Sequence, residues 1–136
     1  MRILWIGNRD LAPRSAHDES TVTVVAPNSS ALRAAHDGAA QADEGCVCLV
    51  NFEEVGRDAS ALQTLNQACP LTPIGLVARC EDREAAFALL RDRVVDRVMS
   101  HADLDERIDL HLEALLAHGQ RLRQLRRDLI ALKDTT

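Results

Sequence analysis

The sequence has few aromatic residues: one tryptophan, two phenylalanines and no tyrosine among 136 residues. This scarcity disfavours a nucleic-acid module that stacks bases on aromatic side chains, and a formal net charge of -5 gives no general phosphate-binding field. Apolar runs are short, whereas a bilayer-spanning helix needs about 20 apolar residues. The amino terminus lacks the pattern of a secretory signal. We therefore expect a cytoplasmic protein with no nucleic-acid or membrane partner.

The sequence also lacks the paired ligands and loops of common catalytic and metal sites. The cysteines form no CxxC pair, no His or Cys pair completes a zinc ligand set, and no GxGxxG or GxxxxGK[ST] loop is present to hold phosphates. We predict no catalytic residues, no metal and no cofactor. Reduced thiols buried in the core are expected for all four cysteines, with the first two on one face of a strand: Cys46, Cys48, Cys69 and Cys80.

The histidines form no recognisable catalytic set with serine, cysteine or aspartate. His17 and His36 lie in polar segments. His111 and His118 are seven residues apart on one helical face, where we expect them to face solvent. His101 follows an apolar segment, and we expect it to be a satisfied surface histidine. The chain is therefore not expected to be an enzyme.

Short apolar segments alternate with segments of helical periodicity along the chain. Three segments are expected to be helices, at residues 28–36, 59–68 and 82–91. Five are expected to be strands, at residues 3–6, 22–26, 46–50, 74–78 and 94–99. This alternation predicts an α/β fold with a doubly wound, five-stranded parallel sheet. The fifth strand is the most polar and is expected nearest an edge.

The last segment, from about Leu104 to Lys133, differs from the others. Apolar residues recur at spacings of three and four, interrupted by Gly119, and a helix of about 30 residues extends about 45 Å. Its first half can pack on the sheet and its second half projects. We predict a coiled coil, in its simplest form a parallel pair, through the leucine seam, which consists of Leu122, Leu125, Leu129 and Leu132. The alternative is that the second half is a solvent-exposed tail.

Charge is also distributed unevenly. Residues 1–120 contain 11 Lys and Arg against 19 Asp and Glu, whereas residues 121–136 contain five against two. The predicted organisation is a domain at residues 1–116 and a helical extension at residues 117–136, which pairs with a second copy of the chain.

The order and spacing of these segments resemble the receiver domain of bacterial two-component response regulators, which is a flavodoxin-like fold. The resemblance covers residues 1–116 and rests on four strings taken together: MRILWIG, CVCLVN, PIGLVA and VVDRVMSH. It implies a five-stranded parallel sheet with functional residues at the carboxyl ends of the strands. The segment between the first two strands is shorter than in the family, so the first helix is expected to be reduced or lost.

The resemblance also implies that the family's phosphorylation chemistry is missing. Gly7 and Asn8 stand in place of the acidic pair that holds magnesium, and Asn51 replaces the phosphoacceptor aspartate. Ala78 replaces the family's Thr or Ser, Ser100 replaces its lysine, and Arg97 replaces its aromatic switch residue. We therefore predict a degenerate, pseudo-receiver form that does not accept a phosphoryl group.

Two other families fit the sequence less well. The strings MRIL and VTVVAP resemble the opening of survival-protein nucleotidases, but those enzymes are much longer and carry consecutive aspartates where Gly7, Asn8 and Arg9 stand here. A nucleotide-binding α/β domain would need a glycine-rich phosphate loop, which the sequence lacks.

The functional expectation is a regulatory domain of a bacterial signalling protein. It would relay signals through protein contacts and the leucine seam to an output domain, for which an enzyme of cyclic-di-GMP turnover is one candidate. Another signalling protein is a candidate partner. The alternative is a stand-alone interaction module of the same fold.

Overall fold

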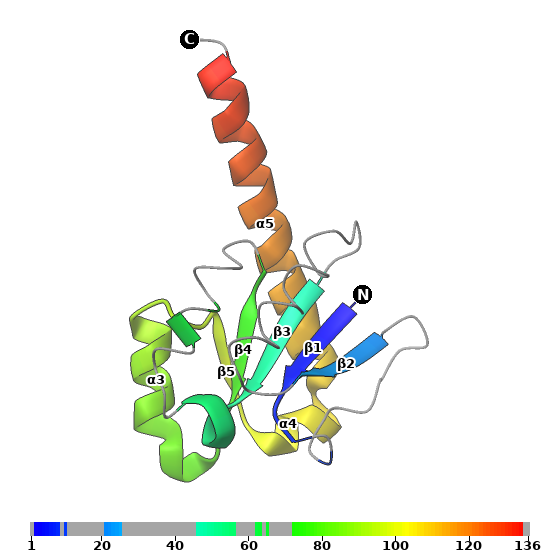
Figure 1. Ribbon diagram of the computed structural model, residues 1–136, viewed down its shortest axis with the longest axis vertical. Coiled ribbons are helices and arrows are strands. Elements are labelled where there is room, and N and C mark those ends of the chain that lie inside the picture. The colour runs from blue at the N-terminus through cyan, green and yellow to red at the C-terminus, as the bar shows by residue number, and fades with distance from the viewer. Residues whose placement is uncertain are drawn as a thin grey trace.

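The computed structural model describes residues 2–8, 10, 21–25, 46–56, 62, 63, 65 and 72–134. Its centre is a parallel sheet of five strands in the order β2-β1-β3-β4-β5 (Figure 1). The strands are β1 (Arg2–Ile6), β2 (Thr21–Val25), β3 (Cys46–Asn51), β4 (Ile74–Val77) and β5 (Arg97–Met99). This confirms the predicted α/β fold, and the order is that of flavodoxin-like sheets.

The central strands are buried on both faces, as their continuous apolar sequences predict. Alternate residues of β3 belong to opposite sides: Cys46 and Cys48 pack in one apolar cluster, and Val47 and Leu49 pack in the other. The predicted placement of the first two cysteines on one face is therefore confirmed. Trp5 of β1 is fully buried in the second cluster.

The fifth strand is shorter than predicted, because the preceding residues remain tied to the helix before it. That helix is α3 (Arg83–Arg91), which follows the 3-10 turn η3 (Cys80–Asp82) and agrees with the predicted helix at 82–91. The backbone N–H of Val94 donates to the carbonyl of Leu89, and Arg93 turns the chain with φ of 61°. Pairing with β4 starts only at Arg97, opposite Gly75. β5 lies at an edge of the sheet, as predicted.

The long C-terminal helix begins later than predicted. A short helix, α4 (His101–Glu106), comes first, and α5 (Ile108–Asp134) follows after a break at Arg107. α5 packs on one face of the sheet through Ile108, Leu112 and Leu115, whereas α3 packs on the other face through Ala86. It then continues well past the sheet towards the C-terminus (Figure 1).

Gly75 of β4 lets α5 approach the sheet closely. A Cβ at this position would lie 2.9 Å from Leu49 Cδ2 and 3.0 Å from Leu115 Cδ1. The first half of α5 is therefore fixed by direct packing of Leu115 over a residue that has no side chain.

Some predictions concern residues outside the described part of the chain. These are the helix at 28–36, the reduced first helix, Cys69, His17 and His36. From the predicted helix at 59–68, Leu62, Gln63 and Leu65 are described as helical, and both leucines are buried in the core. None of the described helices combines the length and apolarity needed to cross a membrane.

Candidate functional site

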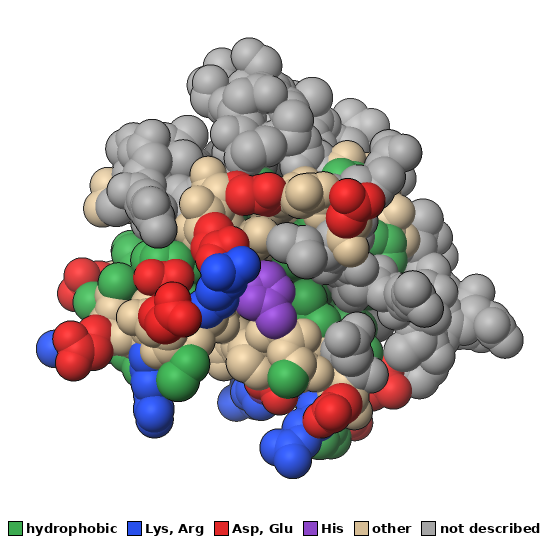
Figure 2. Space-filling model, turned by 90° about the horizontal axis from the view of Figure 1, so that it is seen from below, with side chains coloured by type: hydrophobic (Ala, Val, Ile, Leu, Met, Phe, Trp, Pro, Cys, Tyr) green, Lys and Arg blue, Asp and Glu red, His purple; other side chains and the backbone are tan. Residues whose placement is uncertain are grey.

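The residues expected at the degenerate pocket lie where strands end. Gly7 and Asn8 follow β1, Asn51 ends β3, Ala78 follows β4, and Ser100 follows β5. Because all five strands are parallel, these residues fall along one edge of the sheet, which we call the carboxyl edge. Figure 2 shows this end of the molecule, where acidic, basic and histidine side chains gather.

Asn51 and Gly7 lie against each other at this edge. Asn51 is fully buried, and among the described residues neither polar atom of its amide has a hydrogen-bond partner. Gly7 has φ of 156°, and a Cβ there would lie 2.9 Å from Asn51 Cβ and 2.5 Å from Glu54 Oε2. An acidic side chain at position 7 therefore has no room while these two side chains keep their places.

A carboxylate does reach the end of β1, but it comes from the π-helical turn η2 (Phe52–Gly56). Glu54 Oε2 accepts a hydrogen bond of 2.5 Å from the backbone N–H of Asn8. The Asn8 side-chain oxygen accepts from the backbone N–H of Asp10 at 3.0 Å, so this amide stabilises the local turn. The sequence did not predict this contact, because no local pattern shows that the Glu54 side chain reaches the end of β1.

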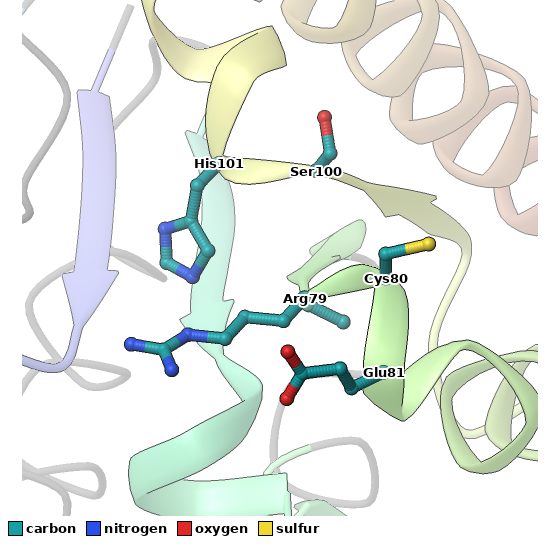
Figure 3. Close-up of a pocket in the computed structure, with 6 residues that line it drawn as sticks. Arg79, Cys80, Glu81, Ser100 and His101 are labelled. Atoms are coloured by element: carbon teal, nitrogen blue, oxygen red, sulfur yellow. The ribbon is translucent and has the colours of Figure 1, made fainter.

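An open cavity of about 450 Å³ lies at the carboxyl ends of β4 and β5. Figure 3 shows the His101 ring directed towards the Arg79 side chain, while the Ser100 hydroxyl points away from Arg79 and Glu81. Arg79 Nε lies 2.5 Å from a carboxylate oxygen of Glu53, which neutralises this cation. The cavity is lined by Ala78, Arg79, Cys80, Glu81, Ser100 and His101.

Two expectations at the cavity are wrong. Cys80 is exposed rather than buried, because it starts η3 at the rim of the cavity. His101 is not a satisfied surface histidine, since its Nε2 is buried and has no hydrogen-bond partner among the described residues. Within the part of the chain that the structure describes, no three His, Cys, Asp or Glu side chains converge in a way that could hold a metal ion.

Ser100 has a structural contact that its sequence position did not indicate. It is the N-cap of α4: its hydroxyl accepts from the backbone N–H of Asp103, and its own N–H donates to the Asp103 carboxylate at 3.0 Å. The backbone hydrogen bond from Ser100 is the main cause that lowers the pKa of Asp103. Asp103 is thereby fixed in the first turn of α4, close to α5.

Both histidines of α5 contact residues at the β5 edge. The expectation that they face solvent is wrong for His111, whereas the His118 side chain is 42% exposed. His111 Nδ1 accepts a hydrogen bond of 2.6 Å from Arg97 Nε, and its side chain is 14% exposed. His118 Nε2 lies 3.1 Å from Asp96 Oδ1. Burial, followed by the charge of Arg97, lowers the pKa of His111, and Asp103 partly opposes this shift.

The projecting half of α5 is the second candidate site. Leu125, Leu129 and Leu132 have exposed fractions of 59%, 60% and 63%, and Ile130 is also exposed at 51%. Leu122, nearer the sheet, is partly buried. The burial of α5 against the sheet ends at Gly119.

No protein-family model matches the sequence, and no curated protein matches it significantly. Two solved structures share the fold at 14% sequence identity. An adenylate cyclase from Rhodopirellula baltica gives a TM-score of 0.66, over 94% of this chain and 96% of that one. The response regulator LqsR from Legionella pneumophila gives 0.59, over 96% of this chain but only 48% of its own length. The chain therefore has a receiver-like fold.

Proposed function

We propose that the chain is a regulatory receiver-like domain that accepts no phosphoryl group and relays its signal through α5 to an output domain. The carboxyl edge supports the first part. An amide at position 51 cannot form an acyl phosphate, and the buried contact of Asn51 with Gly7 leaves no space for a magnesium-binding acid beside it. Input to the domain would then come from a binding partner rather than from phosphorylation.

The projecting half of α5 is the observation that carries the proposal. A helix of 27 residues is about 40 Å long, and only its first half has a sheet to cover. Each leucine buried in a two-stranded seam contributes roughly 1.5–3 kcal/mol, so four per chain support a moderate homodimer. In this proposal residues 1–116 form the domain, and residues 117–136 form the dimerising linker.

We further propose that the output domain is an enzyme of cyclic-nucleotide metabolism in a bacterial cytoplasm, with cyclic-di-GMP turnover as one example. The fold neighbour described as an adenylate cyclase supports an output of this kind. The domain itself would be non-enzymatic and would control the output by setting how the two helices pair.

The phosphorylation part is tested with a small phosphodonor and magnesium, followed by intact-mass measurement. Neither the wild type nor Asn51→Asp should gain a phosphoryl group, because the metal ligands remain absent in the variant. Acid-labile phosphate on the wild-type protein, at one group per chain, contradicts the proposal.

The dimer is tested by measuring the molecular mass in solution, by light scattering or sedimentation equilibrium, which needs no functional assay. The double variant Leu125→Ser/Leu129→Ser should be monomeric where the wild type is dimeric. Leu110→Ser is the matched control: Leu110 is 63% exposed on α5 but lies outside the leucine seam, so this variant should stay dimeric. A wild type that is monomeric at tens of micromolar would instead favour a stand-alone interaction module.

A further inference from the structure

The leucine seam continues back into the domain, and two histidines lie in its register. Steps of seven residues from Leu132 lead to Leu125, His118 and His111, while the same steps from Leu129 lead to Leu122, Leu115 and Ile108. A two-stranded coiled coil repeats every seven residues, with apolar positions a and d separated by three and four. His111 and His118 therefore hold the same heptad position, d, as Leu125 and Leu132.

α5 has two apolar faces that overlap, because Ile108 and Leu115 share a heptad row with Leu122 and Leu129 but pack on the sheet. Ile108, Leu112, Leu115 and Gly119 are buried against the sheet. At about 100° per residue, their mean direction differs by about 90° from that of the leucine seam. The histidines lie with the seam and not with the sheet face. Since both of them contact residues at β5, the seam side of α5 is the side of that edge strand.

The two histidines are held with different strength. His111 is enclosed, with Arg97 on Nδ1 and Asp103 at 3.5 Å from Nε2, and its side chain is only 14% exposed. His118 has one polar partner among the described residues, Asp96, and its side chain is 42% exposed. Asp96 is itself fixed to β4, because its other carboxylate oxygen accepts from the backbone N–H of Ile74 at 2.7 Å.

We propose that His118 is a switch residue at the domain end of the leucine seam, an inference that rests on the proposed dimer. Bonded to Asp96, it holds the seam side of α5 against the β5 edge, and the coiled coil begins at Leu122. Released from Asp96, it takes the next d position, and the coiled coil extends by one step towards the domain. His111 stays bonded in both arrangements and anchors the helix.

Direct contacts connect the carboxyl edge to the leucine seam, so a change at this edge could alter the seam. The cap residue Ser100 lines the cavity and binds Asp103, and Asp103 lies against His111 one heptad before His118. A partner that moves β5 or α4 would therefore change the position of α5 at His118, while His111 keeps its contacts. His118 bonded to Asp96 and His118 released from it are the two discrete states that such coupling requires.

The partner of the seam is a second copy of this chain. The repeat of 3.5 residues that Leu122, Leu125, Leu129 and Leu132 keep matches the groove of a helix with the same repeat. In such a dimer a two-fold axis places equivalent d residues opposite each other, so His118 of one copy would face His118 of the other.

The experiment measures the dimer dissociation constant of the full chain by sedimentation equilibrium. His118→Leu removes the contact with Asp96 and supplies an apolar d residue, so the dimer should tighten about tenfold or more. Gln120→Leu is the matched control. It adds the same side chain to an exposed position on the opposite side of α5 and should change the constant less than about twofold.

Asp96→Asn tests the switch without altering α5. The asparagine oxygen can still accept from Ile74, but the charge facing His118 is lost, so the dimer should tighten about two- to fivefold. Equal tightening by His118→Leu and Gln120→Leu would overturn the register. Unchanged or weaker dimerisation of Asp96→Asn would overturn the switch. If the wild type and every variant remain monomeric, the proposed dimer itself is wrong.

Discussion

Asn51 is a polar side chain that is fully buried beside apolar ones. Buried amides are nearly always hydrogen-bonded, because an unpaired amide loses its contacts with water and gains none in return. Among the described residues, neither polar atom of this side chain is paired. Within the described part of the chain, this side chain therefore packs beside Gly7 without a polar contact.

Asn51→Leu should therefore stabilise the protein. Leucine has a similar volume and carries no polar atom, so the free energy of unfolding should rise by about 1–2 kcal/mol. Chemical denaturation measures the change. Asn8→Leu is the control, because Asn8 is exposed and its side chain bonds Asp10, so that variant should be neutral or slightly destabilised. A loss of stability in Asn51→Leu would mean that the amide has a structural partner.

His111 gives stability a defined dependence on pH. Its pKa is lowered in the folded state from the ordinary value of 6.5, so the folded chain binds fewer protons than the unfolded chain below that pH. The stabilisation of the folded state by neutral His111 is fully present above pH 6.5 and is lost as the pH falls through the pKa of the folded state. Protonation removes the acceptor of Arg97 and adds a cation beside it.

The measurement is the denaturation midpoint between about pH 7.5 and 5.5. The wild type should lose stability over this range, and His111→Gln should lose less, because glutamine does not titrate. Parallel curves for the two proteins would contradict the assignment. Asp103 adds a separate loss below its ordinary pKa of 3.8, since its folded pKa is also lowered.

At the scale of elements, α4 depends on one cap. Ser100→Ala should reduce the free energy of unfolding by about 1 kcal/mol, because the first turn of α4 loses its hydroxyl acceptor. Ser100→Thr should retain most of the stability. The pKa of Asp103, followed by NMR titration, should rise in the alanine variant as the cap loosens. If alanine and threonine behave alike, the cap does not stabilise α4.

The predicted long helix shows where sequence periodicity was sufficient and where it was not. Spacings of three and four identified the helix and its projection, but they merged two faces into a single stripe broken at Gly119. The structure separates them, because Ile108, Leu112 and Leu115 pack on the sheet while Leu125 and Leu129 lie on another side of α5. Both faces have helical periodicity, so periodicity alone could not divide them.

At the scale of the whole molecule, the charge asymmetry should oppose the proposed dimer. Residues 121–136 contain five Lys and Arg against two Asp, so two such segments repel when they pair in parallel. Salt screens this repulsion, and the dimer should tighten as ionic strength rises from about 50 to 300 mM. Sedimentation equilibrium at several salt concentrations tests this. Weaker association at higher salt would indicate that the basic segment binds the acidic part of another copy.

The sequence by itself determined the five strands and their order along the chain. Short β-branched and apolar segments alternate with helical ones, and the periodicity of each segment identifies it as strand or helix. A helix between two strands forms a right-handed crossover, so the alternation specifies a parallel sheet. The same reasoning placed Gly7, Asn51 and Ser100 at the ends of strands, since parallel strands share a carboxyl edge. The absence of an acidic residue at position 51 and of a lysine at position 100 was also readable from the sequence.

Only the tertiary structure decided which distant side chains meet. Glu54 reaches Asn8 across 46 positions, and Arg97 reaches His111 across 14, through turns whose geometry depends on the packed core. Local spacing described His111 and His118 as two residues on one face, but it carried no information on what that face contacts. The physical reason is that periodicity reflects interactions between chain neighbours, whereas burial and hydrogen bonding depend on how the sheet and α5 pack together.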